Sequence, residues 1–259
     1  MNNLGSNGRL GNQMFQYAAL IGIAKNCGFD FRIPKNCDLL RGFEMKNSYD
    51  RYGFIDGDEV LLHESHEFCE ELFNQCPDGV TLNGYFQTEK YFKNVESLVR
   101  QDFTFNKDIQ DEVYFYYGKY LDKNPVSIVV RDYNDKFDYP GCHHNHRNLP
   151  TDYFYKSIEL MGRDRTYIIC SNNIELCKSI FIGDNFIFND VSTKSEKQFF
   201  DLCLSSKCKD FITSNSTFSW WAAWLGNGRV FVPTPWYGPG LYKNNTDDLY
   251  PEGWEKIEC

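Results

Sequence analysis

The feature that most constrains this chain is a regular alternation of short apolar runs and longer amphipathic segments between residues 126 and 232. The apolar runs predict strands at residues 126–130, 165–170, 186–188, 209–213 and 230–232. The segments between them predict helices at residues 151–161, 174–181, 196–205 and 217–225. Because strands that alternate with helices are joined by crossover connections, the pattern predicts an α/β fold with a parallel, doubly wound sheet.

The chain before residue 122 predicts a second α/β layer with a less regular pattern. A glycine loop at residues 8–11 precedes an apolar stripe with helical spacing, and Gly28 provides an end for this helix. Further strands are expected at residues 29–33 and 80–86, further helices at 89–103 and 108–121, and polar loops between 35 and 80. We therefore expect two lobes, residues 1–122 and 123–259, with a cleft between them.

Polar residues follow three of the predicted strands, at 131–135, 171–173 and 214–216. Ligands of doubly wound sheets bind outside the carboxyl ends of the strands, so these residues are candidates for a site. Arg131 keeps its charge at any physiological pH and could bind a phosphate through two hydrogen bonds. An ion pair with a neighbouring aspartate would explain the same residue equally well.

Two segments have the composition of anion-binding loops. Residues 214–217 place hydroxyl and amide groups before an apolar helix, where backbone N–H groups and the helix dipole attract a diphosphate. Ordinary capping of that helix by Ser216 or Thr217 explains the segment equally well. The glycine loop at residues 8–11 could likewise bind a ligand through its backbone, or could be a tight turn that requires glycine.

Charge and composition argue against several classes of protein. The formal net charge is −9, whereas nucleic-acid-binding proteins normally carry a basic face. No apolar run reaches the roughly 18 residues of a membrane span, and the N-terminus lacks the pattern of a secretion signal. The ten cysteines include no C-x-x-C pair, so no zinc site is expected, and we expect a cytoplasmic protein with reduced thiols.

Five segments, in order along the chain, carry a resemblance to a known family. They are GRLGNQMFQYA at residues 8–18, GYFQTEKYF at 84–92, LPTDYF at 149–154, the segment at 214–225, and V-P-x-x-W at 232–236. Together these segments resemble glycosyltransferase family 11, the α-1,2-fucosyltransferases. The resemblance extends over nearly the whole chain, and long ordered matches are more specific than one short motif.

The resemblance implies a GT-B fold with two Rossmann-like lobes, of which residues 1–122 face the acceptor and residues 123–259 bind the nucleotide sugar. It implies GDP-fucose as the donor and the 2-hydroxyl of a β-galactoside in an oligosaccharide as the acceptor. It also implies inversion at the anomeric carbon, with no cofactor and no metal requirement.

On this resemblance, Arg131 is the expected catalytic cation. Asp132 is the first candidate for the general base and Asp135 the second, because both lie close to Arg131 in the sequence. The residues expected to bind the donor are Gly8, Arg9, Gly11, Asn12, Gln13, Arg131, Ser171, Asn173, Ser214, Asn215, Ser216 and Thr217.

The chain departs from the family at the end of the strand predicted at residues 126–130. The family carries His-x-Arg-Arg-x-Asp there, whereas this chain has Val129 and a single arginine, Arg131. Residues 172 and 173 are asparagines where the family often has acidic residues. A related transferase with a different nucleotide sugar, or an inactive homologue that binds a nucleotide or a glycan, therefore stays open as an alternative.

Two clusters resemble metal sites. Cys142, His143, His144 and His146 lie in a loop with no obvious further ligand, so contact with a phosphate or sugar hydroxyl, or simple solvation, explains them better. The tripeptide D-G-D at residues 56–58 resembles the D-x-D signature of metal-dependent glycosyltransferases, but it is also a common turn. We therefore expect no metal ligands.

Overall fold

A computed structural model describes most of the chain. The described residues are 4–5, 7–35, 37–48, 51–53, 60–64, 67–134, 142–241 and 244–259. The chain divides into two compact units, the first with Met1–Asn106 and Asn245–Pro251, and the second with Lys107–Asn244 and Glu252–Cys259.

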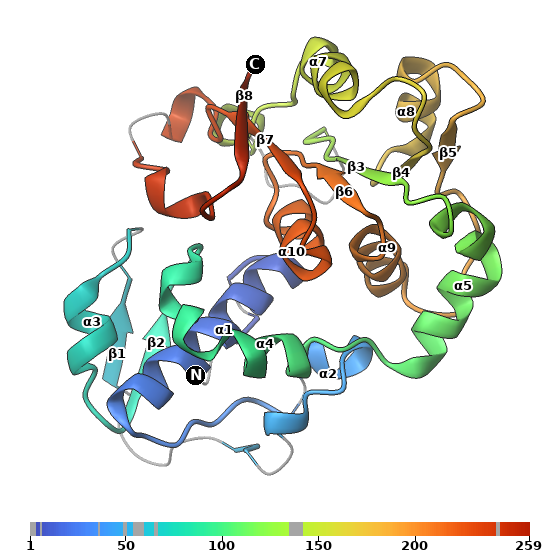
Figure 1. Cartoon of the computed structure of the whole chain (residues 1–259). Coiled ribbons are helices and arrows are strands. Elements are labelled where there is room, and N and C mark those ends of the chain that lie inside the picture. The colour runs from blue at the N-terminus through green and yellow to red at the C-terminus, as the bar shows by residue number, and fades with distance from the viewer. Residues whose placement is uncertain are drawn as a thin grey trace. The chain divides into compact units, whose positions relative to one another are not determined.

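The second unit is built on a six-stranded parallel sheet (Figure 1). Its strands are β3 (Val126–Val130), β4 (Tyr167–Ser171), β5 (Phe186–Phe188), β6 (Asp210–Ile212), β7 (Val230–Thr234) and β8 (Glu255–Glu258). Their order in the sheet is β5-β4-β3-β6-β7-β8, and every neighbouring pair is parallel. The predicted doubly wound sheet is therefore confirmed. Its strand order reverses between β3 and β6, and ligands of such sheets bind at this switch point.

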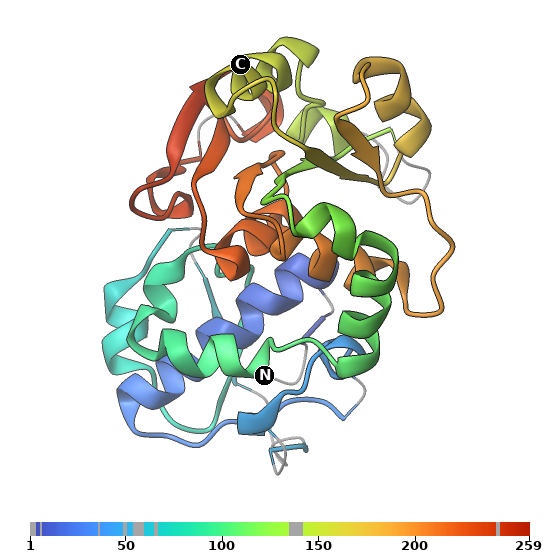
Figure 2. The same ribbon diagram turned by 45° about the vertical axis from the view of Figure 1, so that its right-hand side comes forward.

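Helices cover both faces of this sheet (Figures 1 and 2). One face carries α7 (Thr151–Met161) and α8 (Ile174–Ile180), and the other carries α9 (Lys197–Ser206) and α10 (Thr217–Gly226). A further helix, α5 (Lys107–Leu121), packs on α9. All five residues of β3 are buried as a result, which explains why four of its five residues are apolar and why the strand shows no alternation of apolar and polar residues.

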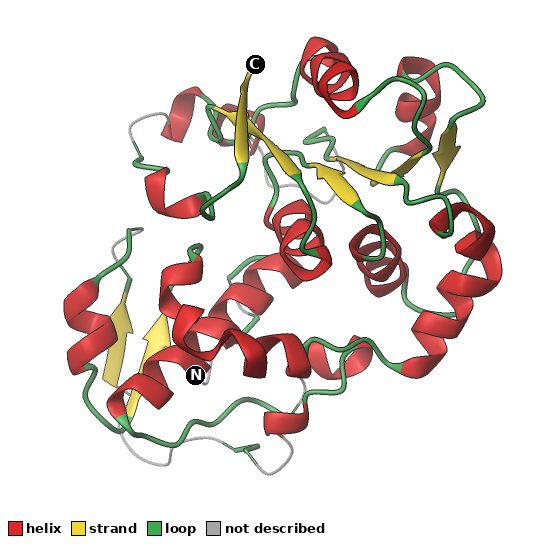
Figure 3. Ribbon diagram, in the orientation of Figure 1, coloured by secondary structure: helices red, strands yellow, loops and turns green. Residues whose placement is uncertain are grey.

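The first unit contains more helix and loop than strand among its described residues (Figure 3). It has one parallel pair, β1 (Val60–His63) with β2 (Val80–Asn83). Its helices are α1 (Leu10–Cys27), α2 (Leu39–Gly42), α3 (Glu70–Gln75) and α4 (Glu96–Asp102), with short 3₁₀ turns η1 (Lys46–Ser48), η2 (Glu89–Tyr91), η3 (Lys93–Val95) and η5 (Asp247–Leu249).

Helix α1 is the centre of the first unit. Fourteen of its 18 residues are buried, because α2, α3, η2 and η3 all pack against it. The helix ends where the sequence predicted, at Gly28, whose left-handed backbone (φ 77°) closes the last turn by donating to the carbonyl of Ala24.

Two predicted elements of the first unit are wrong. The segment 29–33 forms no strand, and Ile33 makes only a single parallel bridge with Tyr52, because Phe31 and Ile33 are buried in the core of the unit. The helix predicted at 89–103 is divided into η2, η3 and α4, with a break at Phe92 (φ −139°). Close packing of this segment on α1 accounts for the break, since the carbonyl oxygen of Tyr91 lies where a side chain at position 22 would be.

Three other features differ from the sequence-based expectation. Strand β1 and the final strand β8 were not expected, because three of the four residues of each are exposed and neither shows a clear apolar pattern. The two compact units divide before Lys107 rather than after residue 122, because α5 packs on α9 of the second unit.

Within the described residues, the helices lack the combination of length and apolar composition that a bilayer span requires.

Candidate active site at the carboxyl edge of the six-stranded sheet

The carboxylate of Asp132 is the centre of a hydrogen-bond network directly after β3. Oδ1 accepts hydrogen bonds from the backbone N–H of Asn134 (2.9 Å), from Asn134 Nδ2 (3.1 Å) and from Asn148 Nδ2 (3.2 Å). Oδ2 accepts a fourth from Asn173 Nδ2 at 2.7 Å. Burial alone would raise the pKa of Asp132, but the hydrogen bonds outweigh burial and place this pKa below its ordinary value. Asp132 is therefore a fixed anion.

The loop after β4 holds the same residue by its backbone. Asn172 Oδ1 accepts from the N–H of Asp132 and Asn172 Nδ2 donates to its carbonyl, both at 2.8 Å. Asn173 also caps α8, where its Oδ1 accepts from the N–H of Leu176 at 3.2 Å. Ser171 supports this turn by accepting the N–H of Asn173 at 3.0 Å. The loops after β3 and β4 thus form one unit.

Tyr133 connects the β3 loop to the β6 loop across the switch point. Its N–H donates to Asn148 Oδ1 at 2.7 Å, and its hydroxyl donates to the carbonyl of Asn215 at 2.6 Å. The guanidinium carbon of Arg131 lies 5.0 Å from the centre of the Tyr133 ring, within the range of a cation–π contact. His146 stacks on the same ring with a centroid distance of 5.3 Å. Arg131 therefore lies against a ring that is held at both ends.

The segment after β6 combines buried scaffold with a helix start. Ser214 and Asn215 are each 1% exposed, and Asn215 Nδ2 donates to the carbonyls of Arg147 (3.0 Å) and Trp236 (3.1 Å). Ser216 is the N-cap of α10, and its hydroxyl accepts the N–H of Phe218 at 3.3 Å. The capping interpretation of Ser216 is thus confirmed, and it leaves the helix start, with its positive dipole end, at the sheet edge.

The remaining predicted site residues belong to the first unit. Gly8 has φ +87°, and an added side chain would come within 1.9 Å of Asn12 Nδ2, so glycine is required for this turn. Asn12 Oδ1 accepts from Gln87 Nε2 at 3.1 Å, and Gln13 Nε2 donates to Asp38 Oδ2 at 3.0 Å. Gly11 is buried within α1, whereas Arg9, its N-cap, is exposed. The donor-binding role of these residues stays a prediction.

Two predicted features cannot be placed. Asp135 and the D-G-D tripeptide at residues 56–58 lie outside the described residues. Of the histidine cluster, His146 stacks on Tyr133 and His144 is exposed on α6 (Cys142–Asn145). The described part of the chain holds no group of three or more His, Cys, Asp or Glu side chains arranged for a metal ion.

Sequence reasoning assigned no individual role to several residues that complete the site. These are Tyr133, Asn134, Asn148 and Arg147, of which Arg147 donates through Nη2 to the carbonyls of Pro235 (3.2 Å) and Cys259 (2.9 Å). Their partners lie up to 112 residues away in the chain. A local sequence signal existed for Tyr133 and Asn134, which lie in the segment 131–135 that follows a predicted strand.

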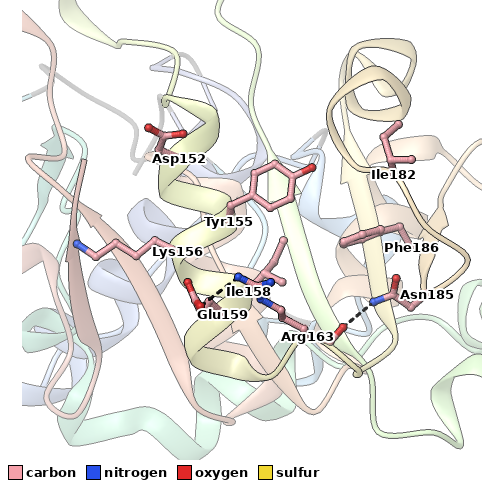
Figure 4. Close-up of a pocket in the computed structure, with 9 residues that line it drawn as sticks. All are labelled: Asp152, Tyr155, Lys156, Ile158, Glu159, Arg163, Ile182, Asn185 and Phe186. Atoms are coloured by element: carbon pink, nitrogen blue, oxygen red, sulfur yellow. Dashed lines mark hydrogen bonds and ion pairs between the residues drawn. The ribbon is translucent and has the colours of Figure 1, made fainter.

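A separate open cavity of about 460 Å³ lies on the outer surface of the second unit (Figure 4). It is lined by α7 and residues 182–186, with Tyr155, Lys156, Glu159 and Ile182 among its walls. None of the described residues that the sequence selected for the site lines this cavity, and its charges are of both signs.

A comparison of the sequence with known families decides the family. The profile of glycosyl transferase family 11 matches residues 74–258, which is more than half of the 259-residue chain. The chain belongs to glycosyltransferase family 11. The matched part includes β2, the whole β3 loop network and the β6–α10 segment.

Relatives of this family 11 protein cover most of its length. An α-1,2-colitosyltransferase from Escherichia coli is 29% identical, over 97% of each chain. The O-antigen biosynthesis glycosyltransferase WbnK from Escherichia coli is 26% identical, over 95% of this chain and 97% of its own. Galactoside α-(1,2)-fucosyltransferase 2 from Pongo pygmaeus is 24% identical, over 85% of this chain and 68% of its own.

Solved structures of fucosyltransferases have the same fold. A mutant of FUT1 from Arabidopsis thaliana in complex with GDP matches with a TM-score of 0.54 at 15% identity, over 97% of this chain and 75% of its own. The fucosyltransferase NodZ from Bradyrhizobium matches with a TM-score of 0.52 at 11% identity, over 82% and 87%. The family 11 protein therefore has the α/β, GT-B-type fold that its sequence predicted.

Proposed function

We propose that this family 11 glycosyltransferase transfers L-fucose from GDP-fucose to the 2-hydroxyl of a β-galactoside, with inversion and without a metal ion. The names of two relatives, an α-1,2-colitosyltransferase and a galactoside α-(1,2)-fucosyltransferase, support the linkage. GDP in the FUT1 complex supports the nucleotide. The observation that carries the proposal is the anchored Arg131–Tyr133 pair at the switch point of the sheet.

In the proposed mechanism, Arg131 neutralises the leaving diphosphate. Negative charge grows on that group as the bond to the sugar breaks, so a cation that is already in position stabilises the transition state more than the ground state. Tyr133 restricts Arg131, and the planar guanidinium can donate two hydrogen bonds to one phosphate. The start of α10 at residues 216–217 adds its dipole to the same region of the sheet edge.

The other proposed donor-site residues form two groups, those whose side chains hold loops and those proposed to contact the donor. Side-chain hydrogen bonds hold loops in the first group, which contains Asn12, Gln13, Asn173, Asn215 and Ser216. We propose that these residues shape the site. The backbone of residues 8–11, the exposed Arg9 and Thr217 are proposed to contact the donor itself.

The proton of the acceptor hydroxyl is proposed to pass to a carboxylate of the β3 loop. Asp132 already accepts four hydrogen bonds and has a depressed pKa, and both effects weaken its affinity for a proton. We therefore place Asp135 ahead of Asp132 as the general base, and assign Asp132 the role of an anionic anchor for the loop.

A second candidate function is the transfer of colitose by the same site. The observation in its favour is the 29% identity to an α-1,2-colitosyltransferase over 97% of both chains. Both candidates share the site and the 1,2-linkage and differ only in the sugar that is transferred.

The first experiment is an assay of product formation in EDTA with GDP-fucose, GDP-mannose, UDP-sugars and nucleotide-linked colitose, and with several β-galactosides as acceptors. Mass spectrometry identifies the sugar that is added, and linkage analysis tests the 1,2-bond. We expect a fucosylated product in EDTA. Exclusive use of colitose would select the second candidate, and the absence of any product would overturn both.

Replacement of Arg131 by alanine tests the role of the cation. Loss of one fixed group that stabilises a developing anion costs on the order of 10²–10³ in kcat, so we expect that reduction in Arg131→Ala. Arg163→Ala is the matched control, since Arg163 is 75% exposed and forms an ion pair with Glu159 of α7, away from the sheet edge. Near-normal turnover of Arg131→Ala, in a folded protein, would contradict the proposal.

A further inference from the structure

A cluster of polar side chains lies at the carboxyl ends of β1 and β2, outside the site described above. The parallel register pairs His63 with Asn83, the last residues of the two strands. Asn83 Nδ2 lies 3.1 Å from His63 Nδ1, and Asn7 Nδ2 donates to Asn83 Oδ1 at 2.9 Å. We call these three residues, together with Tyr85, the β1–β2 edge cluster.

Tyr85 is presented outward by a tightly built turn. Glu64 Oε2 accepts the backbone N–H groups of both Tyr85 (2.7 Å) and Phe86 (2.6 Å). Phe86 is fully buried with φ 55°, a conformation that a bulky residue rarely adopts, and Gly84 leaves no room for a side chain because Glu64 Cβ would be 2.5 Å away. The turn that buries Phe86 leaves Tyr85 39% exposed, two residues after Asn83 in the chain.

A buried side chain of helix α1 supports the cluster. The side chain of Gln16 is 1% exposed and donates through Nε2 to the carbonyls of Asn7 (3.1 Å) and Gly84 (3.0 Å). Its Oε1 accepts the N–H of Gly5 at 3.2 Å. One buried amide therefore connects the loop that carries Asn7 to the turn that carries Tyr85. A cluster ordered in advance loses less entropy when it binds a ligand.

The chemistry of the cluster suits an uncharged ligand that is rich in hydroxyl groups. Amide and imidazole groups offer both donors and acceptors, and an aromatic ring provides an apolar face. The carboxylate of Glu64 is occupied by two backbone N–H groups of the turn. Sugars have this combination of hydroxyl groups and apolar C–H faces, whereas a diphosphate would require cations.

We propose that the β1–β2 edge cluster binds the acceptor saccharide, with the amide of Asn83 and the imidazole of His63 on its hydroxyl groups and Tyr85 against its apolar face. The inference rests on the proposed function, because it assumes that a saccharide is the second substrate. It assigns acceptor specificity to residues that the sequence did not select.

The test is steady-state kinetics of Asn83→Ala, His63→Ala and Tyr85→Ala with lactose as acceptor and GDP-fucose as donor. One neutral hydrogen bond is worth about 0.5–1.5 kcal/mol, so we expect the KM for lactose to rise about three- to tenfold in Asn83→Ala and His63→Ala. We expect it to rise in Tyr85→Ala as well, because the apolar face of the sugar loses its contact with the ring. The KM for GDP-fucose and the slow hydrolysis of GDP-fucose without acceptor should change less than about twofold. Matched controls are Asn74→Ala and Tyr114→Ala, two exposed residues that are not part of the cluster.

Two results would overturn the inference. One is an unchanged KM for lactose in all three variants, and the other is an equal rise of the KM for donor and acceptor. If the wild-type protein transfers no sugar, the proposed function fails, and the cluster is then tested by calorimetric binding of lactose. Binding that is lost in Asn83→Ala and kept in Asn74→Ala would support the cluster, and absence of binding to the wild type would overturn it.

Discussion

At the scale of single residues, the site depends on how one carboxylate is held. Asp132 is 7% exposed, and its four hydrogen bonds come from Asn134, Asn148 and Asn173. A buried carboxylate that lacks such donors would tend to bind a proton. With them it stays charged and holds the β3 loop, which contains Arg131 and Tyr133.

Asn173→Ser isolates one of these donors, because serine can still cap α8 while the hydrogen bond to Asp132 is lost. Hydrogen bonds to charged groups contribute about 1.5–3 kcal/mol, so we expect the free energy of unfolding at pH 7 to fall by that amount.

The effect should depend on pH, because the pKa of Asp132 in the folded protein is below its ordinary value. The contribution of the Asp132 carboxylate to stability is complete above the unfolded pKa of about 3.9, and it is lost as the pH falls through the lower, folded pKa.

Two measurements check this prediction. In chemical denaturation, the difference between Asn173→Ser and wild type should shrink as the pH falls through the folded pKa, and a constant difference would contradict the account. In kinetics, the acid limb of kcat/KM should keep its position. A shift of that limb to higher pH would identify Asp132 as the proton acceptor, because the substitution raises the pKa of Asp132.

At the scale of elements, α1 shows how backbone contact decides which residues a helix can tolerate. Gly22 lies inside this helix, where alanine is ordinarily preferred. A Cβ at this position would lie 1.8 Å from the carbonyl oxygen of Tyr91. The glycine therefore permits the contact with the 89–95 segment, and the same contact interrupts the helix that the sequence predicted there.

Gly22→Ala and Gly118→Ala should have opposite effects on stability. Gly118 lies in α5, where an added Cβ meets its nearest neighbour at 3.8 Å. We expect Gly118→Ala to stabilise the protein by about 0.5–1 kcal/mol, and Gly22→Ala to destabilise it by about 1–3 kcal/mol because the backbone must move. Thermal unfolding followed by circular dichroism compares the two, and a stabilising Gly22→Ala would refute this account of the contact.

At the scale of the whole molecule, the chain passes between its two units more than once. The first unit contains Asn245–Pro251 in addition to the first 106 residues. Asp248 holds this late segment, since its Oδ2 accepts the N–H of Phe68 at 3.1 Å and its Oδ1 pairs with Lys90. The chain therefore forms β8, the last strand of the second unit, only after it has passed through the first unit again.

Asp248→Ala should loosen this segment without affecting the six-stranded sheet. Loss of the acceptor leaves the N–H of Phe68 without its partner, so we expect amide exchange at Phe68 and Leu249 to accelerate by roughly fivefold, as for one hydrogen bond of about 1 kcal/mol. Exchange in β3 and β4 should be unchanged. Asp247→Ala, a change of the neighbouring exposed aspartate, should leave Phe68 protected, and equal acceleration in both variants would refute the anchoring role.

The parallel sheet and the family could both be predicted from patterns in the sequence. Each strand from β3 to β7 and each helix from α7 to α10 repeats a local pattern of apolar residues, and such patterns directly reflect which face is buried. The candidate residues after β3, β4 and β6 were also predictable, because parallel strands bring their carboxyl ends to one edge. For the same reason, Arg131, Asp132, Asn173 and Asn215 can be assigned to this edge from their positions in the sequence.

Only the tertiary structure decided which side chains meet. The sequence could not pair Asp132 with Asn148 and Asn173, or His63 with Asn83, because these contacts depend on register and loop conformation rather than on local periodicity. It also could not predict the break at Phe92 or the pairing of β8, since both follow from contacts with distant elements. The physical reason is that burial of one face of an element requires a repeating pattern of apolar residues, whereas a hydrogen bond between distant residues requires no such pattern.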